Sequence, residues 1–121
     1  MVDDLRTKLY LITPPHLDDV AAFAEQLKGV LDTGGAACVQ LRLKDVHDDI
    51  IRRTADILRP VAQDRDVAFV INDRPDLARE TGSDGVHVGQ DDASYAEARA
   101  LLGTDAIVGV TCKASRHLAI E

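Results

Sequence analysis

The sequence predicts a parallel α/β fold and, within that class, the first half of a (β/α)8 barrel. Short apolar segments alternate strictly with segments of helical periodicity along the 121 residues, which is the pattern of parallel sheets with right-handed crossovers. Polar residues collect on one parity of these apolar segments, as they do inside a barrel. The pattern supplies five strands, whereas a barrel needs eight strands and about 200 to 250 residues. We therefore expect residues 1–121 to form the N-terminal part of a single barrel domain.

The first strand is expected at Lys8 to Thr13, an apolar run that ends at a pair of prolines, and proline cannot continue a central strand. A helix is expected from Asp18, a candidate N-cap, because the apolar positions after it recur at helical spacing. The adjacent glycines Gly34 and Gly35 end this helix. The second strand is expected at Ala37 to Leu43.

The rest of the chain repeats the alternation. A helix from His47 to Asp64 has one broad apolar face, and Pro60 is placed to kink or shorten its end. Gly82 is placed to end the short helix that precedes it. The remaining expected elements are strands at Val67 to Asn72, Gly85 to Gly89 and Ala106 to Thr111, helices at Pro75 to Thr81 and Ser94 to Gly103, and a helix beginning near Ser115.

The distribution of side chains within the strands favours a barrel over an open doubly wound sheet. In the second strand, valine and leucine occupy one parity, and the other parity holds Cys38, Gln40, Arg42 and Lys44. An open sheet is covered by helices on both faces and tends to have apolar residues on both parities. In a barrel one parity points inward, and polar groups gather at the C-terminal mouth.

Composition places the chain among ordinary globular domains, with 45% apolar and 29% charged residues. No apolar run approaches the roughly 20 residues that span a bilayer, and the first residues lack the pattern of a signal peptide, so we expect a cytoplasmic protein without membrane contact. The net charge of -7 argues against nucleic-acid binding. In that compartment Cys38 and Cys112 are expected to be buried thiols.

Two carboxylates follow neighbouring expected strands. Asp73 comes after the third strand and Asp92 after the fourth, and parallel strands deliver their ends to one rim of the sheet. Such a pair suits Mg²⁺, which takes few carboxylates and completes its shell with water and phosphate oxygens. Arg42 and Lys44 would neutralise the remaining charge of a diphosphate. The sequence therefore predicts a magnesium-bound diphosphate at this rim.

Simpler interpretations of the same residues stay open. Asp73 and Asp92 could be loop residues or N-caps, and Arg42 and Lys44 could form a solvated charge pair with Asp45. Asn72 could only terminate its strand through a local turn. His87 could be a structural histidine.

Five motifs resemble those of the thiamine phosphate synthase family. They are LYLIT near the start, QLRLK at Gln40 to Lys44, IND at Ile71 to Asp73, GVHVGQDD at Gly85 to Asp92 and GVT at Gly109 to Thr111. The resemblance implies a (β/α)8 barrel that joins an aminopyrimidine-methyl diphosphate to a thiazole phosphate. In that dissociative reaction diphosphate leaves first, and the thiazole nitrogen captures the pyrimidine cation.

The resemblance also implies roles for individual residues. Asp73 and Asp92 would bind Mg²⁺, and His87 would line the pyrimidine pocket. Thr111 stands where the family usually has serine, and Lys113 stands where members often have histidine. The residues implied to bind the pyrimidine diphosphate are Gln40, Arg42, Lys44 and Asn72. The implied partners are small-molecule substrates, with a homo-oligomer as a further expectation.

Two other functions remain open. Thiazole tautomerases share the barrel but tend to lose the Asn-Asp pair and the second aspartate, all of which this chain retains as Asn72, Asp73 and Asp92. A truncated, non-catalytic diphosphate-binding protein would also fit the length. The family's thiazole phosphate segment has no counterpart in these residues, so we expect the 121 residues alone to be inactive.

Overall fold

The computed structural model of the chain describes residues 9–89 and 95–110. Strands and helices alternate throughout these residues, as predicted. The order is β1 (Leu9–Ile12), α1 (Val20–Leu31), β2 (Ala36–Leu41), α2 (Asp48–Gln63), β3 (Ala68–Asn72), α3 (Pro75–Glu80), β4 (Gly85–Val88), α4 (Tyr95–Leu102) and β5 (Ile107–Val110). The helix expected near Ser115 lies outside the described residues.

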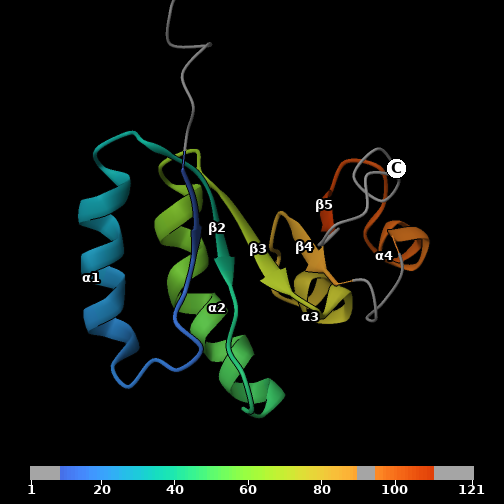
Figure 1. The fold of residues 1–121 in the computed structure, drawn as a ribbon, viewed down its shortest axis with the longest axis horizontal. Helices are drawn as coiled ribbons and strands as arrows, with labels where there is room; N and C mark the ends of the chain where they lie inside the picture. The colour runs from blue at the N-terminus through green and yellow to red at the C-terminus, as the bar shows by residue number, and fades with distance from the viewer. Residues whose placement is uncertain (1–8, 90–94, 111–121) are drawn as a thin grey trace, which may run out of the picture.

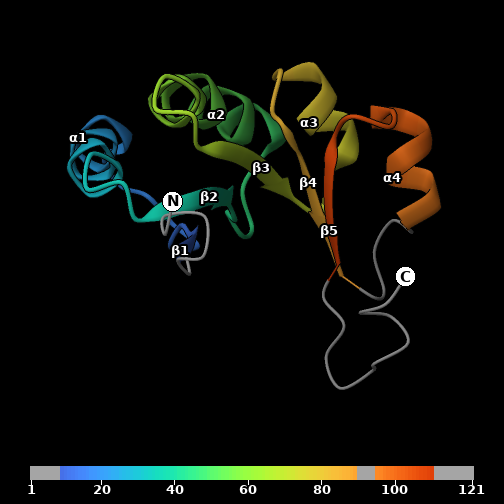
Figure 2. The same cartoon turned by 90° about the horizontal axis from the view of Figure 1, so that it is seen from above.

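The strands form one parallel sheet in which each strand pairs with the next along the chain, in the order β1-β2-β3-β4-β5. A doubly wound sheet would reverse this order at some point and place helices on both faces. Here the helices lie in chain order along one face of the curved sheet, and no described helix covers the other face (Figures 1 and 2). The described residues therefore have the arrangement of a barrel wall, and the barrel alternative is confirmed.

The core lies between the sheet and its helices and uses one parity of each strand. Leu41 of β2 and Phe69 of β3 are among the largest fully buried side chains. Helix residues such as Leu58 and Leu77 complete the same cluster. Apart from Ala36 at the start of β2, the strand residues of this cluster are all of one parity: Val39, Leu41, Phe69, Ile71, Val86 and Val88. The predicted split of the strands is therefore confirmed.

The opposite parity forms the inner face. Tyr10 pairs with Cys38, Gln40 with Val70, and His87 with Gly109 across the sheet. Cys38 is a buried free thiol, as predicted, and it lies outside the main core cluster. Polar side chains on this face lie toward the carboxyl ends of β2, β3 and β4.

Three details differ from the sequence-based expectations. The N-cap of α1 is Asp19 and not Asp18, since Asp19 Oδ1 accepts a hydrogen bond from the Ala22 amide at 3.0 Å. The strand β2 ends at Leu41, so the residues after it belong to the β2–α2 loop. Pro60 does not shorten α2, which is one of the two effects expected of it: the helix continues to Gln63, next to its expected end at Asp64. No described helix is both long and apolar enough to pass through a membrane.

Gly85 lies at a close approach between the neighbouring strands β4 and β5. A Cβ atom built on Gly85 would overlap the carbonyl oxygen of Ile107, its partner in β5. A side chain at this position would push β4 and β5 apart, because a backbone carbonyl in a paired strand cannot move aside freely.

We predict that Gly85→Ala destabilises the protein by about 1–3 kcal/mol or more, the usual cost of overpacking. Gly29→Ala is the matched control, because Gly29 lies inside α1 with nothing within 4 Å of an added Cβ. Alanine there should stabilise by about 0.5–1 kcal/mol. Urea unfolding of both variants, made in the complete gene product, checks the prediction. Equal effects at the two positions would contradict it.

Candidate functional site

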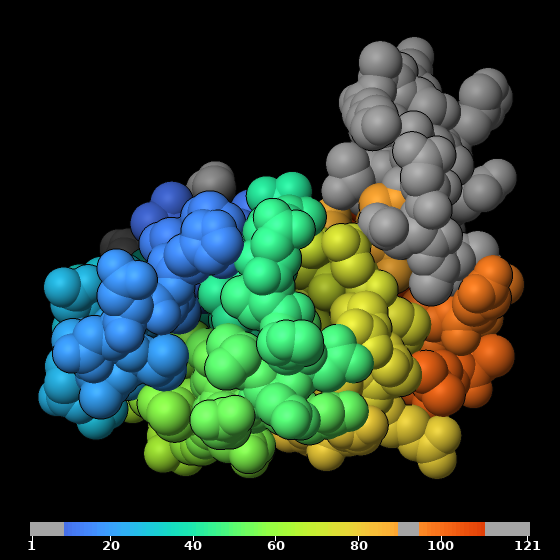
Figure 3. Space-filling model, turned by 90° about the horizontal axis from the view of Figure 1, so that it is seen from below, coloured from blue at the N-terminus to red at the C-terminus, as the bar shows by residue number. Residues whose placement is uncertain are grey.

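The candidate site lies at the rim where the parallel strands end. In Figure 1 the arrowheads of β2 and β3 point to the lower edge, and Figure 3 views the molecule from that side. The structure brings to this rim the following predicted site residues: Gln40, Arg42, Lys44, Asn72, Asp73 and His87. Asp92 and Thr111 lie outside the described residues, as do Gln90 and Lys113.

Asp73 has an unusual backbone conformation for a residue directly after a strand, with φ of +67°. Its amide donates a hydrogen bond of 2.7 Å to the carbonyl oxygen of His87 on β4. Its Oδ2 lies 3.8 Å from Lys44 Nζ, and both side chains are between a third and two fifths exposed. The predicted carboxylate and one predicted cation therefore lie together at the rim, where a ligand could reach both.

The β1–α1 loop holds the segment that carries Arg42 and Lys44. The Arg42 amide donates to Thr13 Oγ1 at 2.9 Å, and the Lys44 amide donates to the Pro15 carbonyl at 3.0 Å. Thr13 is buried, and its own amide donates to the carbonyl of Gln40 at 3.0 Å. These bonds continue the alignment of β1 and β2 beyond the strand ends and fix the backbone of the two basic residues.

Gln40 lies on the inner face of β2 and is only 2% exposed. Its Nε2 donates to the hydroxyl of Tyr10 at 3.0 Å. With the amide oriented in this way, Oε1 remains as the acceptor of the side chain. Burial raises the pKa of the Tyr10 hydroxyl and of the neighbouring Cys38 thiol. Both groups stay protonated at neutral pH, so Cys38 is not an activated thiolate.

His87 lies on the inner face of β4 against the backbone of β5. A Cβ added to Gly109 would stand 2.7 Å from His87 Nδ1, so glycine is required opposite this ring. Burial lowers the pKa of His87, and the nearby Asp73 carboxylate opposes that shift. The imidazole is therefore neutral at pH 7 and adds no positive charge to the rim.

The described donors fit a magnesium ion better than a metal held entirely by side chains. Residues 9–89 and 95–110 contain no group of three or more histidine, cysteine, aspartate or glutamate side chains that could hold a metal ion. Mg²⁺ needs only one or two carboxylates and takes its other ligands from water and phosphate. Asp73, a partly exposed carboxylate beside a cation, meets that requirement.

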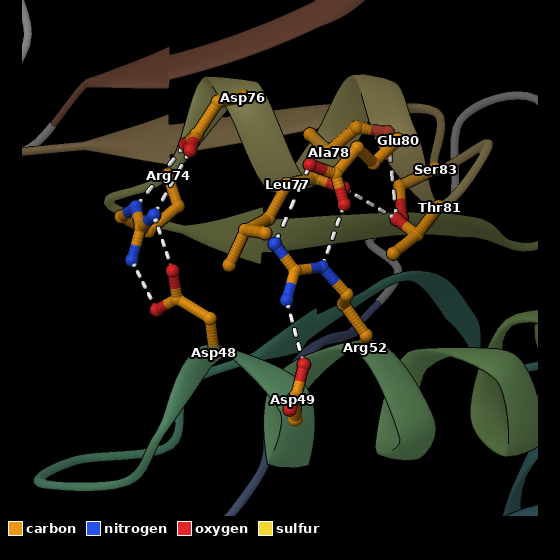
Figure 4. A network of polar contacts seen from close by, with 10 residues as sticks. All are labelled: Asp48, Asp49, Arg52, Arg74, Asp76, Leu77, Ala78, Glu80, Thr81 and Ser83. Carbon is orange, nitrogen blue, oxygen red and sulfur yellow. Dashed lines mark hydrogen bonds and ion pairs between the residues drawn. The ribbon is translucent and has the colours of Figure 1, made fainter.

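Arg74, the residue after Asp73, connects the β3–α3 loop to α2 (Figure 4). Its Nη1 and Nη2 donate to the two carboxylate oxygens of Asp48 at 2.6 and 2.9 Å. Its Nε and Nη2 donate to Asp76 at 3.1 and 2.9 Å. The Arg74 guanidinium lowers the pKa of both carboxyl groups, and they in turn raise the pKa of Arg74.

Sequence patterns did not reveal the supporting residues Tyr10, Thr13 and Arg74. Tyr10 and Thr13 lie in the apolar run of β1, where only their hydroxyl groups signal a polar role. Arg74 stands next to a predicted ligand, but its partner Asp48 is 26 residues away in sequence. Each of these contacts joins segments that lie 26 to 30 residues apart in the sequence.

Comparisons with known proteins all identify the same family. A family model described as thiamine monophosphate synthase matches residues 9–121. The thiamine-phosphate synthase of Rhodospirillum centenum is 63% identical over 113 residues, which cover 93% of this chain and 54% of that protein. The enzyme of the same name from Hyphomonas neptunium is 47% identical over 120 residues, covering 96% of this chain and 54% of that protein.

A solved structure also matches. The thiamine phosphate pyrophosphorylase from Pyrococcus furiosus superposes with a TM-score of 0.69 at 30% sequence identity, covering 86% of this chain and 49% of that one. The present chain thus spans about half the length of the relatives it matches.

We predict that Tyr10→Phe destabilises the protein by about 1–3 kcal/mol, because the buried Gln40 amide loses its acceptor. Tyr95→Phe is the control, since Tyr95 is exposed to a similar extent as Tyr10 but accepts its bond from the exposed Arg99 and not from a buried group, so it should change stability by less than about 0.5 kcal/mol. Thermal unfolding of the complete gene product measures both. A smaller effect at Tyr10 than at Tyr95 would contradict the assigned role.

The ion pairs of Arg74 also predict a pH dependence. The folded-state pKa values of Asp48 and Asp76 are lowered, so their stabilising effect is present above the unfolded pKa of about 4 and is lost as pH falls through the folded values. We expect the stability difference between wild type and Arg74→Gln to be present at pH 7 and to shrink below pH ~4. Denaturant unfolding at several pH values tests this; a difference independent of pH would count against it.

Proposed function

The chain belongs to the thiamine monophosphate synthase family, and from this premise we propose that its protein is a thiamine-phosphate synthase. The reaction would join an aminopyrimidine-methyl diphosphate to a thiazole phosphate, giving thiamine phosphate and diphosphate. The observation that best supports this is the meeting of Asp73 and Lys44 at the strand-end rim. A carboxylate and an ammonium group 3.8 Å apart and partly exposed are the groups that a metal-bound diphosphate requires.

The described residues divide into charge-neutralising and orienting groups. Lys44 and Arg42 would balance the charge of the diphosphate, Lys44 as a point charge and Arg42 as a fork. Gln40, with Nε2 bound to Tyr10, would present Oε1 to a donor of the pyrimidine. Asn72 and the neutral His87 would complete the polar wall on β3 and β4. No residue needs to act as a general base in a dissociative substitution.

Asp73 and Asp92 are the proposed ligands of Mg²⁺. When bound, the ion would neutralise the charge that develops on the departing diphosphate. Asp73 fits this role by its position and partial exposure, whereas Asp92 is proposed from its motif alone. Thr111 is likewise proposed from its motif as a substrate-binding hydroxyl.

The same proposal includes the domain in which the reaction would take place. We regard residues 1–121 as the N-terminal part of one (β/α)8 barrel, and the thiazole phosphate site as belonging to the remainder of that barrel. A cytoplasmic location and a homo-oligomeric state stay predictions from the sequence.

We predict that Asp73→Asn lowers magnesium-dependent diphosphate release by about a hundredfold or more, because it removes a metal-binding charge. Asp66→Asn is the control: Asp66 has a similar backbone conformation, with φ of +57°, but precedes β3 at the opposite rim. The assay measures thiamine phosphate and diphosphate from both substrates, with and without Mg²⁺, using the complete gene product.

The outcomes are distinct. Loss of turnover in Asp73→Asn with normal turnover in Asp66→Asn supports the proposal. Wild-type protein that forms no thiamine phosphate would overturn the proposed activity. Unchanged turnover in Asp73→Asn would overturn the role of that carboxylate.

A further inference from the structure

The contacts of Arg74 connect two loops that both contribute to the candidate site. Arg74 follows Asp73 directly in the β3–α3 loop. Asp48, which receives both terminal nitrogens of Arg74, opens α2 just after the β2–α2 loop that carries Lys44. In Figure 3 the green β2–α2 segment and the yellow β3–α3 segment lie side by side at this rim.

The geometry of the contacts makes the connection rigid. Arg74 donates to both oxygens of Asp48 and to both oxygens of Asp76, with distances between 2.6 and 3.1 Å. A planar guanidinium with two carboxylates fixes direction as well as distance, which a single ion pair does not. Figure 4 shows the Arg74 side chain between these two carboxylates.

The backbone adds a second constraint. Asp73 has φ of +67°, in the left-handed region that aspartate can adopt and most other residues avoid. One side of the residue is held by the bond from its amide to His87. The other side is held through Arg74, whose guanidinium is bound to α2 and α3. The position of the Asp73 carboxylate therefore depends on contacts that lie away from the ligand.

We propose that Arg74 is a positioning residue that sets the spacing between Asp73 and Lys44, so that both can reach one metal-bound diphosphate. Arg74 itself does not contact the ligand. Its pairing with Asp48 holds the β3–α3 loop at a fixed distance from the β2–α2 loop. This inference rests on the proposed function, in which Asp73 holds the metal.

A second arginine provides a matched comparison. Arg52 also joins α2 to α3, with Nε donating to Glu80 at 2.6 Å and Nη1 to Asp49 at 2.8 Å (Figure 4). Its side chain is 39% exposed, against 37% for Arg74. Arg52 lies one helical turn after Asp48 on α2, and its hydrogen-bond partners Asp49 and Glu80 belong to α2 and α3 and not to the two site loops. Loss of its contacts should affect helix packing without affecting the metal.

The test compares Arg74→Lys with Arg52→Lys in the complete gene product. Lysine retains the charge but loses the fork. We expect Arg74→Lys to weaken Mn²⁺ binding about tenfold, as is usual for residues that orient a metal ligand, and to raise the Mg²⁺ concentration needed for half-maximal turnover. Arg52→Lys should change neither. Mn²⁺ alone is titrated by electron paramagnetic resonance, and thermal unfolding is recorded for both variants.

Asp48→Asn probes the same pair from the other side. It should also weaken Mn²⁺ binding. In the double variant with Arg74→Lys, the loss of binding free energy should be smaller than the sum of the two single losses, because both changes remove the same interaction. Fully independent effects would contradict a common pairing.

Asp73→Asn separates the inference from the function on which it rests. If Asp73→Asn weakens Mn²⁺ binding but Arg74→Lys behaves as Arg52→Lys does, the positioning role of Arg74 is wrong and the proposed function stands. If Asp73→Asn leaves Mn²⁺ binding unchanged, or wild type binds no Mn²⁺, the metal role and the inference fail together. Weaker binding in Arg74→Lys at equal thermal stability of the two lysine variants supports the inference.

Discussion

The structure depends on burying a single face of the sheet. Phe69, Ile71 and Val86 are completely or almost completely buried against the helices, and each such side chain contributes roughly 1.5–3 kcal/mol. A shift of one residue in any strand would exchange the two parities and expose this set. The register that buries the core therefore also decides which residues line the inner face. The polar rim is a consequence of how the apolar face is packed.

The same constraint explains how much the sequence could predict. Alternation of strand and helix, the parity of β2 and β4 and the position of Asp73 after β3 all follow from local periodicity, and the structure has each of them. Errors occur where neighbouring residues are chemically equivalent. Asp18 and Asp19 can both cap a helix, and the local sequence does not distinguish them; in the structure Asp19 accepts the Ala22 amide. The polar residues after Leu41 could also have extended β2, but their amides bond to the β1–α1 loop instead.

Contacts between loops were beyond prediction for a different reason. Thr13 and Arg42 are 29 residues apart, and Asp48 and Arg74 are 26 apart. Possible charge pairs like the second are numerous in a sequence with 29% charged residues, and no local period distinguishes the pair that forms. Such contacts fix the positions of residues at the rim. The sequence could therefore name candidate residues for the site but not the residues that hold them in place.

The backbone of Asp73 shows why those supporting contacts matter. Asp45 and Asp66 also have positive φ values, of 55° and 57°, but both are exposed, where aspartate tolerates this conformation in a turn. A left-handed aspartate is therefore not by itself a sign of function. At Asp73 the conformation occurs at the end of a central strand, with the amide bonded to β4 and the next side chain bonded to α2. Because these contacts are made by the protein's own backbone and side chains, they hold the Asp73 carboxylate at the rim, and binding need not supply the free energy of ordering it.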